Sequence, residues 1–278
     1  MKRVVTIQDI SCVGKCSLTV ALPIISAMGV ETAVIPTAVL STHTMFSNFT
    51  FHDLTAEIEP IAAHWQQEGI GFDAVYTGYL GSFEQLNIVS RFFDQFKTPE
   101  NLIIVDPVMA DNGKLYPAFS EEFALEMAKL CGKADIILPN LTEACFMTQS
   151  EYHEDYTEEY IADLLQKLAA LGAKKAVLTG VSFEPGQTGA VGLESATGRT
   201  FSYSHEKLPV SYHGTGDIFS STLTGALMRD YPVEEAIRIA ADYTLETIRA
   251  TMQSPKSRWY GVDFELTLPL LIHRLEQA

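Results

Sequence analysis

Long apolar runs, clusters of basic residues and paired cysteines are all scarce in this sequence of 278 residues. No window approaches about 18 uninterrupted apolar residues, and Asp9 interrupts the first apolar stretch too early for a secretory signal. We therefore expect no membrane span and a cytoplasmic protein. The 19 Lys and Arg face 35 Asp and Glu, and the net charge of −16 argues against a nucleic-acid partner. The four cysteines contain no C-x-x-C pair, which favours buried free thiols over a disulfide framework.

The motifs of several common enzyme classes are also missing. No G-x-G-x-x-G follows a predicted strand, which disfavours a dinucleotide-binding fold, and the G-x-S-x-G of many serine hydrolases is absent. The seven histidines lack the spacing of zinc ligands. Gly14-Lys15-Cys16 resembles the end of a P-loop, but the upstream glycine is missing and Cys16 stands where Ser or Thr is needed.

Short β-branched runs alternate with amphipathic segments of helical length along most of the chain. This alternation predicts βαβ units around a mainly parallel sheet, an α/β fold. Residues 189–193 and 199–204, separated by a turn, predict an antiparallel edge. No repeat, low-complexity tract or linker divides the sequence, so we expect one domain over residues 1–278. The other predicted strands are 4–7, 32–40, 74–79, 102–105, 135–138 and 176–179, and the predicted helices are 17–28, 54–67, 83–96, 121–130, 158–171, 218–229, 233–252 and 265–275.

The strongest local signal is the run from His213 to Asp217, directly before an apolar helix. Gly214 and Gly216, on either side of Thr215, let successive backbone N–H groups face one point, and the helix start adds its own N–H groups. Together they predict an anion site suited to phosphate oxygens. A carboxylate beside such a site can deprotonate an acceptor hydroxyl in phosphoryl transfer, which makes Asp217 the candidate base. The alternative is that Asp217 only caps the helix.

Polar residues also follow two other predicted strands. Asp106 comes directly after the strand 102–105, and Asn140 and Glu143 follow the strand 135–138. Ligands bind at the carboxyl ends of strands in α/β sheets, and oxygen ligands suit Mg²⁺, which also uses substrate phosphates. We therefore expect Asp106 and Glu143 to bind Mg²⁺. The alternatives are a turn residue for Asp106 and a capping box for Asn140 with Glu143.

Four short motifs, in this order, resemble those of the ribokinase-like superfamily and, within it, the pyridoxal kinase family. They are Thr77-Gly78-Tyr79-Leu80-Gly81, Asp106-Pro107-Val108-Met109, Pro139-Asn140-x-x-Glu143 and Gly214-Thr215-Gly216-Asp217. The resemblance implies a three-layer α/β/α fold with a mainly parallel central sheet and an antiparallel edge. It further implies transfer of the γ-phosphoryl group of ATP to the 5′-hydroxymethyl group of pyridoxal, pyridoxine or pyridoxamine. It also implies Mg²⁺ and a homodimer, and it leaves a monovalent cation open.

The resemblance assigns roles to single positions as well. It implies that Thr44 contacts the pyridine ring and that Tyr79 flanks it, where an aromatic side chain suits a flat heterocycle. Asp9 and Ser11 become candidates for recognition of the ring hydroxyl or the pyridinium nitrogen. The positions that match the ATP site are Asp106, Asn140, Glu143, Thr179, Leu208 and Tyr212. We expect the aromatic loop 41–53 to close the site, to form a dimer contact, or both.

Two other functions stay open at this point. The hydroxymethylpyrimidine kinases of thiamine synthesis share the fold and the chemistry, and Asp9 followed by Ser11 resembles them more closely. Those kinases usually carry Gly-Thr-Gly-Cys where this chain has Asp217, and they lack a tyrosine at the position of Tyr79. Both differences favour the pyridoxal kinases. The third function is a non-catalytic protein that keeps the fold to store or sense pyridoxal phosphate, but a sensor would not need a base at Asp217.

Overall fold

The computed structural model describes residues 1–276 and divides into two compact units. Unit 1 combines Met1–Ala74 with the segment that starts at Leu208, and unit 2 is the continuous stretch Val75–Lys207. We describe each unit by itself. The single domain predicted over residues 1–278, the last two of which lie outside the described part, stays a prediction.

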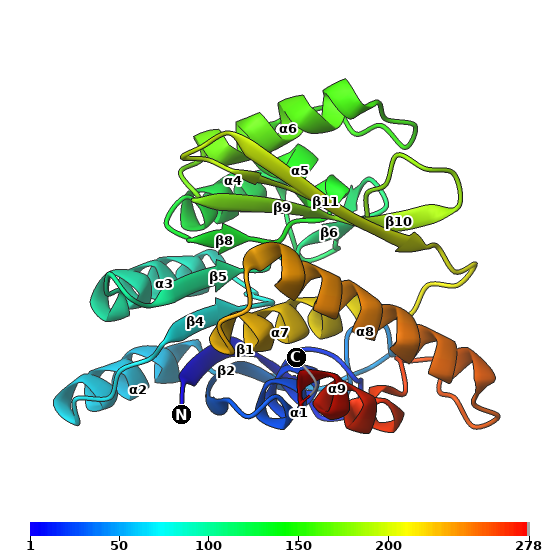
Figure 1. Ribbon diagram of the computed structural model, residues 1–278. Coiled ribbons are helices and arrows are strands. Elements are labelled where there is room, and N and C mark those ends of the chain that lie inside the picture. Colours follow the sequence, from blue (N-terminus) through cyan, green and yellow to red (C-terminus); the bar gives the residue numbers. More distant parts are fainter. Residues whose placement is uncertain (277–278) are drawn as a thin grey trace. The chain divides into compact units, whose positions relative to one another are not determined.

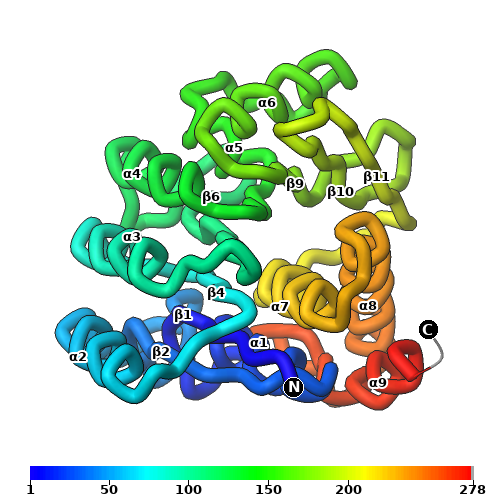
Figure 2. Tube along the Cα trace, turned by 60° about the vertical axis from the view of Figure 1, so that its left-hand side comes forward, coloured from blue at the N-terminus to red at the C-terminus, as the bar shows by residue number. Residues whose placement is uncertain are grey.

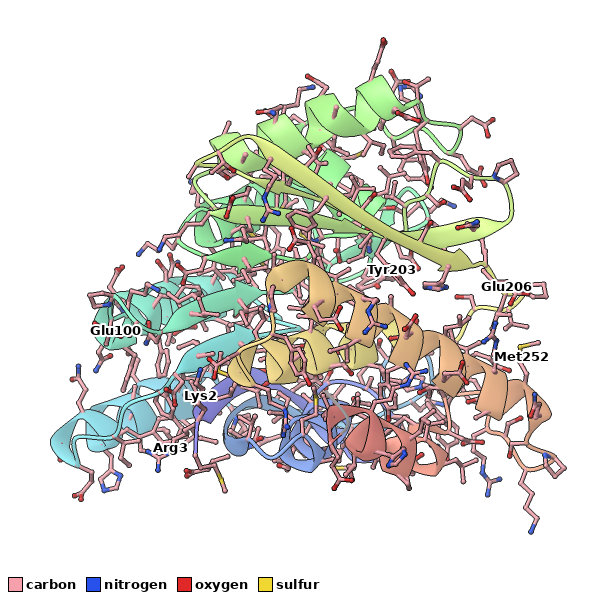
Figure 3. The ribbon with its side chains drawn as sticks, in the orientation of Figure 1. Lys2, Arg3, Glu100, Tyr203, Glu206 and Met252 are labelled. Atoms are coloured by element: carbon pink, nitrogen blue, oxygen red, sulfur yellow. The ribbon has the colours of Figure 1, made fainter. Side chains whose placement is uncertain are left out.

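The first half of unit 1 is a βαβ unit. β1 (Arg3–Ser11) and β2 (Glu31–Leu40) pair in parallel, and the short β3 (Phe51–Asp53) pairs antiparallel with β2. α1 (Leu18–Ala27) packs on both long strands, and α2 (Thr55–Gln67) packs on β2. The apolar residues Val4, Val5 and Ile7 are fully buried, as expected for a strand that is covered on both faces. Lys2 and Arg3 mark the start of β1 in Figure 3.

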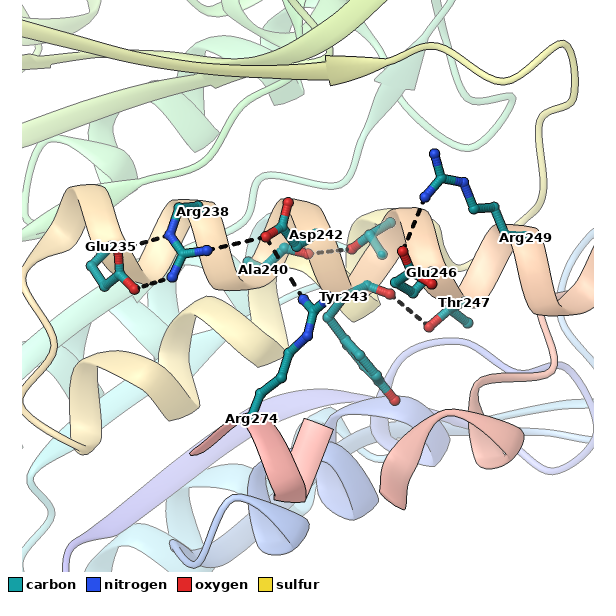
Figure 4. Close-up of polar contacts among 10 residues, drawn as sticks. Glu235, Arg238, Ala240, Asp242, Tyr243, Glu246, Thr247, Arg249 and Arg274 are labelled. Atoms are coloured by element: carbon teal, nitrogen blue, oxygen red, sulfur yellow. Dashed lines mark hydrogen bonds and ion pairs between the residues drawn. The ribbon is translucent and has the colours of Figure 1, made fainter. Parts of the chain in front are cut away.

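The second half of unit 1 is helical. α7 (Thr215–Met228) packs against both α1 and α8 (Val233–Gln253), and the chain ends in a 3₁₀ turn (Phe264–Leu266) and α9 (Leu268–Glu276) (Figure 1). One ion pair joins α8 to α9, because Asp242 lies 3.7 Å from Arg274 (Figure 4). Asp242 also pairs with Arg238 of its own helix at 3.3 Å. Exposed pairs of this kind each contribute little, so buried contacts hold these helices.

Unit 2 is built on a mainly parallel sheet with an antiparallel edge, and its strands follow the order β11-β10-β9-β8-β5-β4. The predicted antiparallel edge is confirmed, because β10 runs antiparallel to both β9 and β11. Tyr203 and Glu206 lie on the outermost strand, β11 (Figure 3). The strands are β4 (Ala74–Thr77), β5 (Leu102–Val105), β8 (Ile136–Ile137), β9 (Lys175–Thr179), β10 (Gln187–Glu194) and β11 (Arg199–Glu206).

Four helices of unit 2 form a row in which each packs on the next (Figure 2). They are α3 (Phe83–Phe96), α4 (Glu121–Cys131), α5 (Leu141–Thr148) and α6 (Glu158–Ala170). A two-stranded hairpin, β6 (Ala110–Asp111) and β7 (Lys114–Leu115), precedes α4 and packs against α5. The α/β prediction is thus confirmed, whereas β3, this hairpin and the full length of α5 were not predicted.

Candidate active site

The turn before α7 has the geometry of an anion site. Gly214 is the N-cap residue of α7, with φ of +83°, and no side chain caps the helix there. The helix begins at Thr215, three residues earlier than predicted, which makes Asp217 the third residue of its first turn. The alternative in which Asp217 is the helix cap is therefore wrong. Asp217 is half-buried, and the N–H groups of this first turn have no partner within the helix.

The two glycines of this turn have different surroundings. A Cβ atom at Gly214 would lie 2.2 Å from the carbonyl oxygen of Lys15, so only glycine fits between the turn and the loop after β1. A Cβ atom at Gly216 would meet no described atom within 4 Å. Gly214 therefore serves the packing of the protein itself, while Gly216 leaves space beside the N–H groups of the turn.

A second carboxyl group, that of Asp9, is buried near the carboxyl end of β1. Asp9 is 4% exposed, and the hydroxyl group of Ser11 donates to it over 3.0 Å. Burial raises the pKa of Asp9, although hydrogen bonds from Ser17 and Ser11 favour the carboxylate. Burial also raises the pKa of the Cys16 thiol, and the charges of Asp217 and Asp9 raise it further. Cys16 therefore stays a neutral thiol.

The position of Asp9 depends on an irregularity in the sheet. The register of β1 and β2 shifts between Gln8 and Ile10, so that Thr37 and Ala38 of β2 face the single residue Asp9. Such bulges redirect side chains, and they are common beside functional sites. The predicted substrate residues Asp9 and Ser11 are thus brought together at the carboxyl end of β1.

An aromatic cluster lies next to the same turn. It consists of His43, Phe46, His213, Trp259 and Tyr260, with His43 and His213 in contact at a ring-centroid distance of 4.3 Å and Phe46 and Trp259 at 4.5 Å. The amide of Met45 donates to Nδ1 of His43 over 3.2 Å, so Nε2 carries the proton that it donates to the carbonyl oxygen of Tyr260, 3.0 Å away. Both ring nitrogens of His43 are therefore already engaged.

His213 differs from His43 in its electrostatics. Burial and the neighbouring His43 lower the pKa of His213 to about 4, so its ring is neutral at pH 7. Thr44, the predicted ring contact, is exposed and directly follows His43. Tyr212 accepts a hydrogen bond of 3.1 Å from the hydroxyl group of Thr215, and Leu208 is half-buried upstream of the same turn.

Unit 2 holds the acidic residues that were predicted to bind magnesium. Glu143 is 2% exposed, and its two carboxylate oxygens accept the amides of Met109 at 3.0 Å and Asn140 at 2.9 Å. Because the side chain of Asn140 accepts the amide of Glu143 in return, the predicted capping box is present. Burial raises the pKa of Glu143, and the charge of Asp106 raises it further.

The remaining predicted residues of unit 2 lie at neighbouring strand ends. Asn140 and Thr179 form a parallel β-bridge, and the Thr179 amide donates to Pro139 over 2.9 Å. Tyr79 is half-buried, with its ring 5.5 Å from that of Phe119. Val108, in the turn after Asp106, has φ of +34°, which is strained for a β-branched residue and resembles the strain found at functional sites.

Clusters of metal-binding side chains and helices that could cross a membrane are both absent from the described residues. Over residues 1–276, no group of three or more His, Cys, Asp or Glu side chains is placed to hold a metal ion. Across the same range, none of the helices combines the length and the apolar character that crossing a bilayer requires.

Comparison with known proteins gives consistent results. The family model for phosphomethylpyrimidine kinase matches residues 21–260. A protein from Bacteroides thetaiotaomicron, named as a candidate phosphomethylpyrimidine kinase and crystallised with pyridoxal, is 39% identical, with a TM-score of 0.90 over 99% of this chain and 96% of its own. Pyridoxal kinase from Lactobacillus plantarum is 31% identical, with a TM-score of 0.91 over 100% and 99%.

A curated relative points the same way. The pyridoxine/pyridoxal/pyridoxamine kinase of Bordetella avium is 26% identical over 258 residues, which cover 89% of this chain and 85% of the relative. The match of the family model over most of the sequence, together with the high TM-scores, identifies the fold as ribokinase-like, as the four motifs implied. The chain is also similar to a pyridoxal kinase of known structure. It belongs to the phosphomethylpyrimidine kinase family, within the ribokinase-like superfamily.

Proposed function

We propose that this chain is a vitamin B6 kinase, which transfers the γ-phosphoryl group of ATP to the 5′-hydroxymethyl group of pyridoxal, pyridoxine or pyridoxamine. The observation that carries this proposal is that Asp217 lies in the first turn of α7. The N-cap residue of this helix is Gly214, which has no side chain to cap the N–H groups of that turn. The position of Asp217 sets its carboxyl group at the N-terminal end of α7, where fixed N–H groups favour a bound anion.

The chemistry follows from the geometry of this turn. In phosphoryl transfer the acceptor hydroxyl must be oriented and deprotonated, while charge on the transferred group is stabilised by fixed dipoles. The Asp217 carboxylate can accept the proton of the alcohol. The amides of Thr215 and Gly216 can stabilise the phosphoryl oxygens, and the open space at Gly216 allows a phosphate to approach the backbone.

The choice of a B6 vitamer as substrate is supported by the comparisons and by the sequence. The relatives from Lactobacillus plantarum and Bordetella avium are named as kinases of B6 vitamers, and the Bacteroides structure was solved with pyridoxal. The buried pair of Asp9 and Ser11 offers polar groups suited to the hydroxyl group or the nitrogen of a pyridine ring. The finer roles of Thr44, Tyr79, Thr179, Leu208 and Tyr212 are part of the same proposal.

Magnesium is the proposed metal, and the residues of unit 2 fit it. Asp106 and Glu143 form a buried pair of carboxyl groups whose mutual repulsion a divalent cation would relieve. When bound, the ion would neutralise charge on the phosphates of ATP. Both oxygens of Glu143 already accept amides, so we assign the direct contact to Asp106 and a supporting role to Glu143. A cytoplasmic location and a homodimer complete the proposal.

Hydroxymethylpyrimidine kinase is the second candidate function. It is favoured by the name of the matching family and by Asp9 followed by Ser11. A panel that supplies ATP and magnesium with each B6 vitamer and with hydroxymethylpyrimidine distinguishes the candidates when phosphorylated products are followed by mass. Preferential phosphorylation of a B6 vitamer supports our proposal, and preferential phosphorylation of the pyrimidine supports the second candidate. If no acceptor is phosphorylated, the chain is a binding protein.

The role of Asp217 gives a direct prediction. Asp217→Asn keeps the shape of the side chain but removes the base, so kcat should fall about 10²–10⁴-fold while the affinity for ATP changes little. Steady-state kinetics and nucleotide titration check this result. Glu84→Gln, which changes an acidic residue in the first turn of α3, is the control and should leave kcat unaltered. Turnover of Asp217→Asn near that of the wild type would remove Asp217 from the mechanism.

A further inference from the structure

Lys15 forms a partly buried ion-pair cluster that no catalytic role yet explains. Its Nζ atom lies 2.7 Å from Oδ1 of Asp263 and 2.9 Å from Oε2 of Glu265, and its side chain is 17% exposed. The side chain of Asp263 is 13% exposed. The ammonium group is thus engaged by two carboxylates, so Lys15 is not placed like the phosphate-binding lysine of a P-loop.

The backbone of Lys15 contacts the proposed catalytic turn. Its carbonyl oxygen is the atom that a Cβ at Gly214 would approach to 2.2 Å. On its other side, the Lys15 Cβ would lie 2.7 Å from a Cβ at Gly261. Lys15 has φ of +53°, and this left-handed conformation must be held by its surroundings. The residue therefore lies between the start of α7 and the segment after α8.

The carboxylates that hold Lys15 are themselves fixed by α8. The amide of Asp263 donates to the hydroxyl oxygen of Thr251 over 2.8 Å. Tyr243 and Thr247 lie earlier in this helix (Figure 4) and contact the same segment. Tyr243 donates to the carbonyl oxygen of Phe264 over 3.3 Å, and the hydroxyl group of Thr247 lies 2.9 Å from that of Thr267. These hydrogen bonds fix the segment that carries the two carboxylates to α8.

We infer that Lys15 is a positioning residue for Asp217, because its ion pairs with Asp263 and Glu265 hold the loop after β1 against Gly214. This inference rests on the proposed function. The contact with Gly214 fixes where α7 begins, and hence where the first-turn amides and the Asp217 carboxyl group lie. The Cα atom of Cys16, the next residue, would lie 3.7 Å from a Cβ at Gly214, so a shift of this loop would also disturb the turn before α7.

Loss of the ammonium group has a defined physical effect. Without it, Asp263 and Glu265 are left as carboxylates with no charge partner from the loop, and the left-handed backbone at Lys15 loses its anchor. Since small misplacements of catalytic groups cost up to about 10²-fold in rate, the expected loss is in turnover more than in nucleotide binding.

The test uses the full chain with Lys15→Met, Asp263→Asn and the double variant. We expect kcat to fall about 10- to 100-fold in Lys15→Met, with KM for ATP changed less than about threefold. The double variant should be no slower than Lys15→Met, because both changes remove one interaction. Lys15→Arg should recover at least about a third of the wild-type kcat, since its charge can meet the same carboxylates.

A second readout does not depend on activity. Amide hydrogen exchange of the peptide that covers the start of α7 should rise at least threefold in Lys15→Met, with the middle of α8 unchanged. Lys2→Met is the matched control, because Lys2 also forms an ion pair in unit 1, with Asp230 at 2.5 Å, but lies outside the loop after β1. This variant should change neither kcat nor the exchange at the start of α7. If the wild type phosphorylates no acceptor, the proposed function fails while exchange still tests Lys15. Unchanged exchange at α7, or unaltered kcat in the folded variant, would overturn the inference.

Discussion

Gly214 and Gly216 stand two residues apart in one turn, yet they meet different physical demands. Gly214 has φ of +83° and touches the backbone of Lys15, so a side chain there is disfavoured by conformation and by space. Gly216 lies inside the first turn of α7, with open space where a Cβ would project. For the stability of the helix, alanine would be the better residue at Gly216.

This contrast predicts opposite outcomes for two alanine substitutions. Gly214→Ala should lower the free energy of unfolding by about 1–3 kcal/mol, because the backbone is strained and a Cβ would collide with Lys15. Gly216→Ala should raise the free energy of unfolding by up to about 1 kcal/mol and still lower kcat by about 10²-fold, since a methyl group would hinder the approach of a phosphate. Urea unfolding and steady-state kinetics measure the two effects, and full activity of Gly216→Ala would contradict the assigned use of that space.

The residues of the site differ in how far the sequence could predict them. The Gly-Thr-Gly-Asp turn was predictable because its parts are contiguous and each has a local physical meaning. The start of α7 was placed too late because glycine is a poor helix former, so residues 215–217 did not read as helical. The aromatic cluster was missed because His43 and Tyr260 lie 217 residues apart, and no local pattern reports such a contact.

Among the elements of unit 2, the strands β5 and β8 are joined by one buried carboxylate. Asp135 accepts the amide of Ile103 over 2.7 Å and pairs with Lys97 at 2.6 Å and with Lys174 at 2.7 Å. Burial alone would raise the pKa of Asp135, but the hydrogen bonds from Lys174, Lys97 and Ile103 lower it overall. The side chain therefore connects the end of α3 with the starts of three strands.

This arrangement predicts how stability depends on pH. A carboxyl group whose pKa is lower in the folded state stabilises the fold above its unfolded pKa, near 3.8, and loses that contribution as the pH falls through the folded value. Asp135→Asn should therefore cost about 1.5–3 kcal/mol at pH 7, and the difference from the wild type should shrink below about pH 3.8. Urea unfolding at pH 7 and pH 3 measures it. Asp94→Asn, at an exposed pair with Lys133, is the control, and a cost that does not depend on pH would argue against the charge of Asp135.

The elements that were predicted best are those in which a sequence pattern extends over many residues. The parallel strands and long helices were found because apolar runs and amphipathic periods extend over several residues. The two-residue strands β6 and β7 were not found, since their pairing is set by the turn at Asn112 and Gly113, where Gly113 donates its amide to Thr142. The capping box at Asn140 was visible in the sequence as an alternative, and it proved real because both of its hydrogen bonds are local.

For the whole molecule, the large acidic excess bears on self-association. The proposed homodimer must bring together two chains that each carry a net charge of −16, so raising the salt concentration should strengthen it by screening their repulsion. Light scattering should give a mass twice the 30.7 kDa of one chain, with a lower dissociation constant at 0.5 M than at 0.05 M salt. Phe51, which is 52% exposed in the loop 41–53, provides the test of a dimer contact there.

Phe51→Ser separates the two predicted uses of that loop. If the loop forms a dimer contact, the substitution should weaken association at least tenfold, because an apolar side chain would no longer be buried. Thr50→Ser, a mild change beside it, is the control. A single-chain mass for the wild type at micromolar concentrations would contradict the homodimer, and unaltered association of Phe51→Ser would assign the loop to the site alone.

The ion pair between Lys15 and Asp263 spans 248 residues, and unit 2 lies between its partners in the sequence. At the usual pace of translation, about 5–20 residues per second, the ribosome makes Lys15 roughly 12–50 s before Asp263. During that delay the nascent chain can complete unit 2, but the loop after β1 has no counterion. The enzyme is therefore expected to become competent only at the end of its synthesis, in one late step.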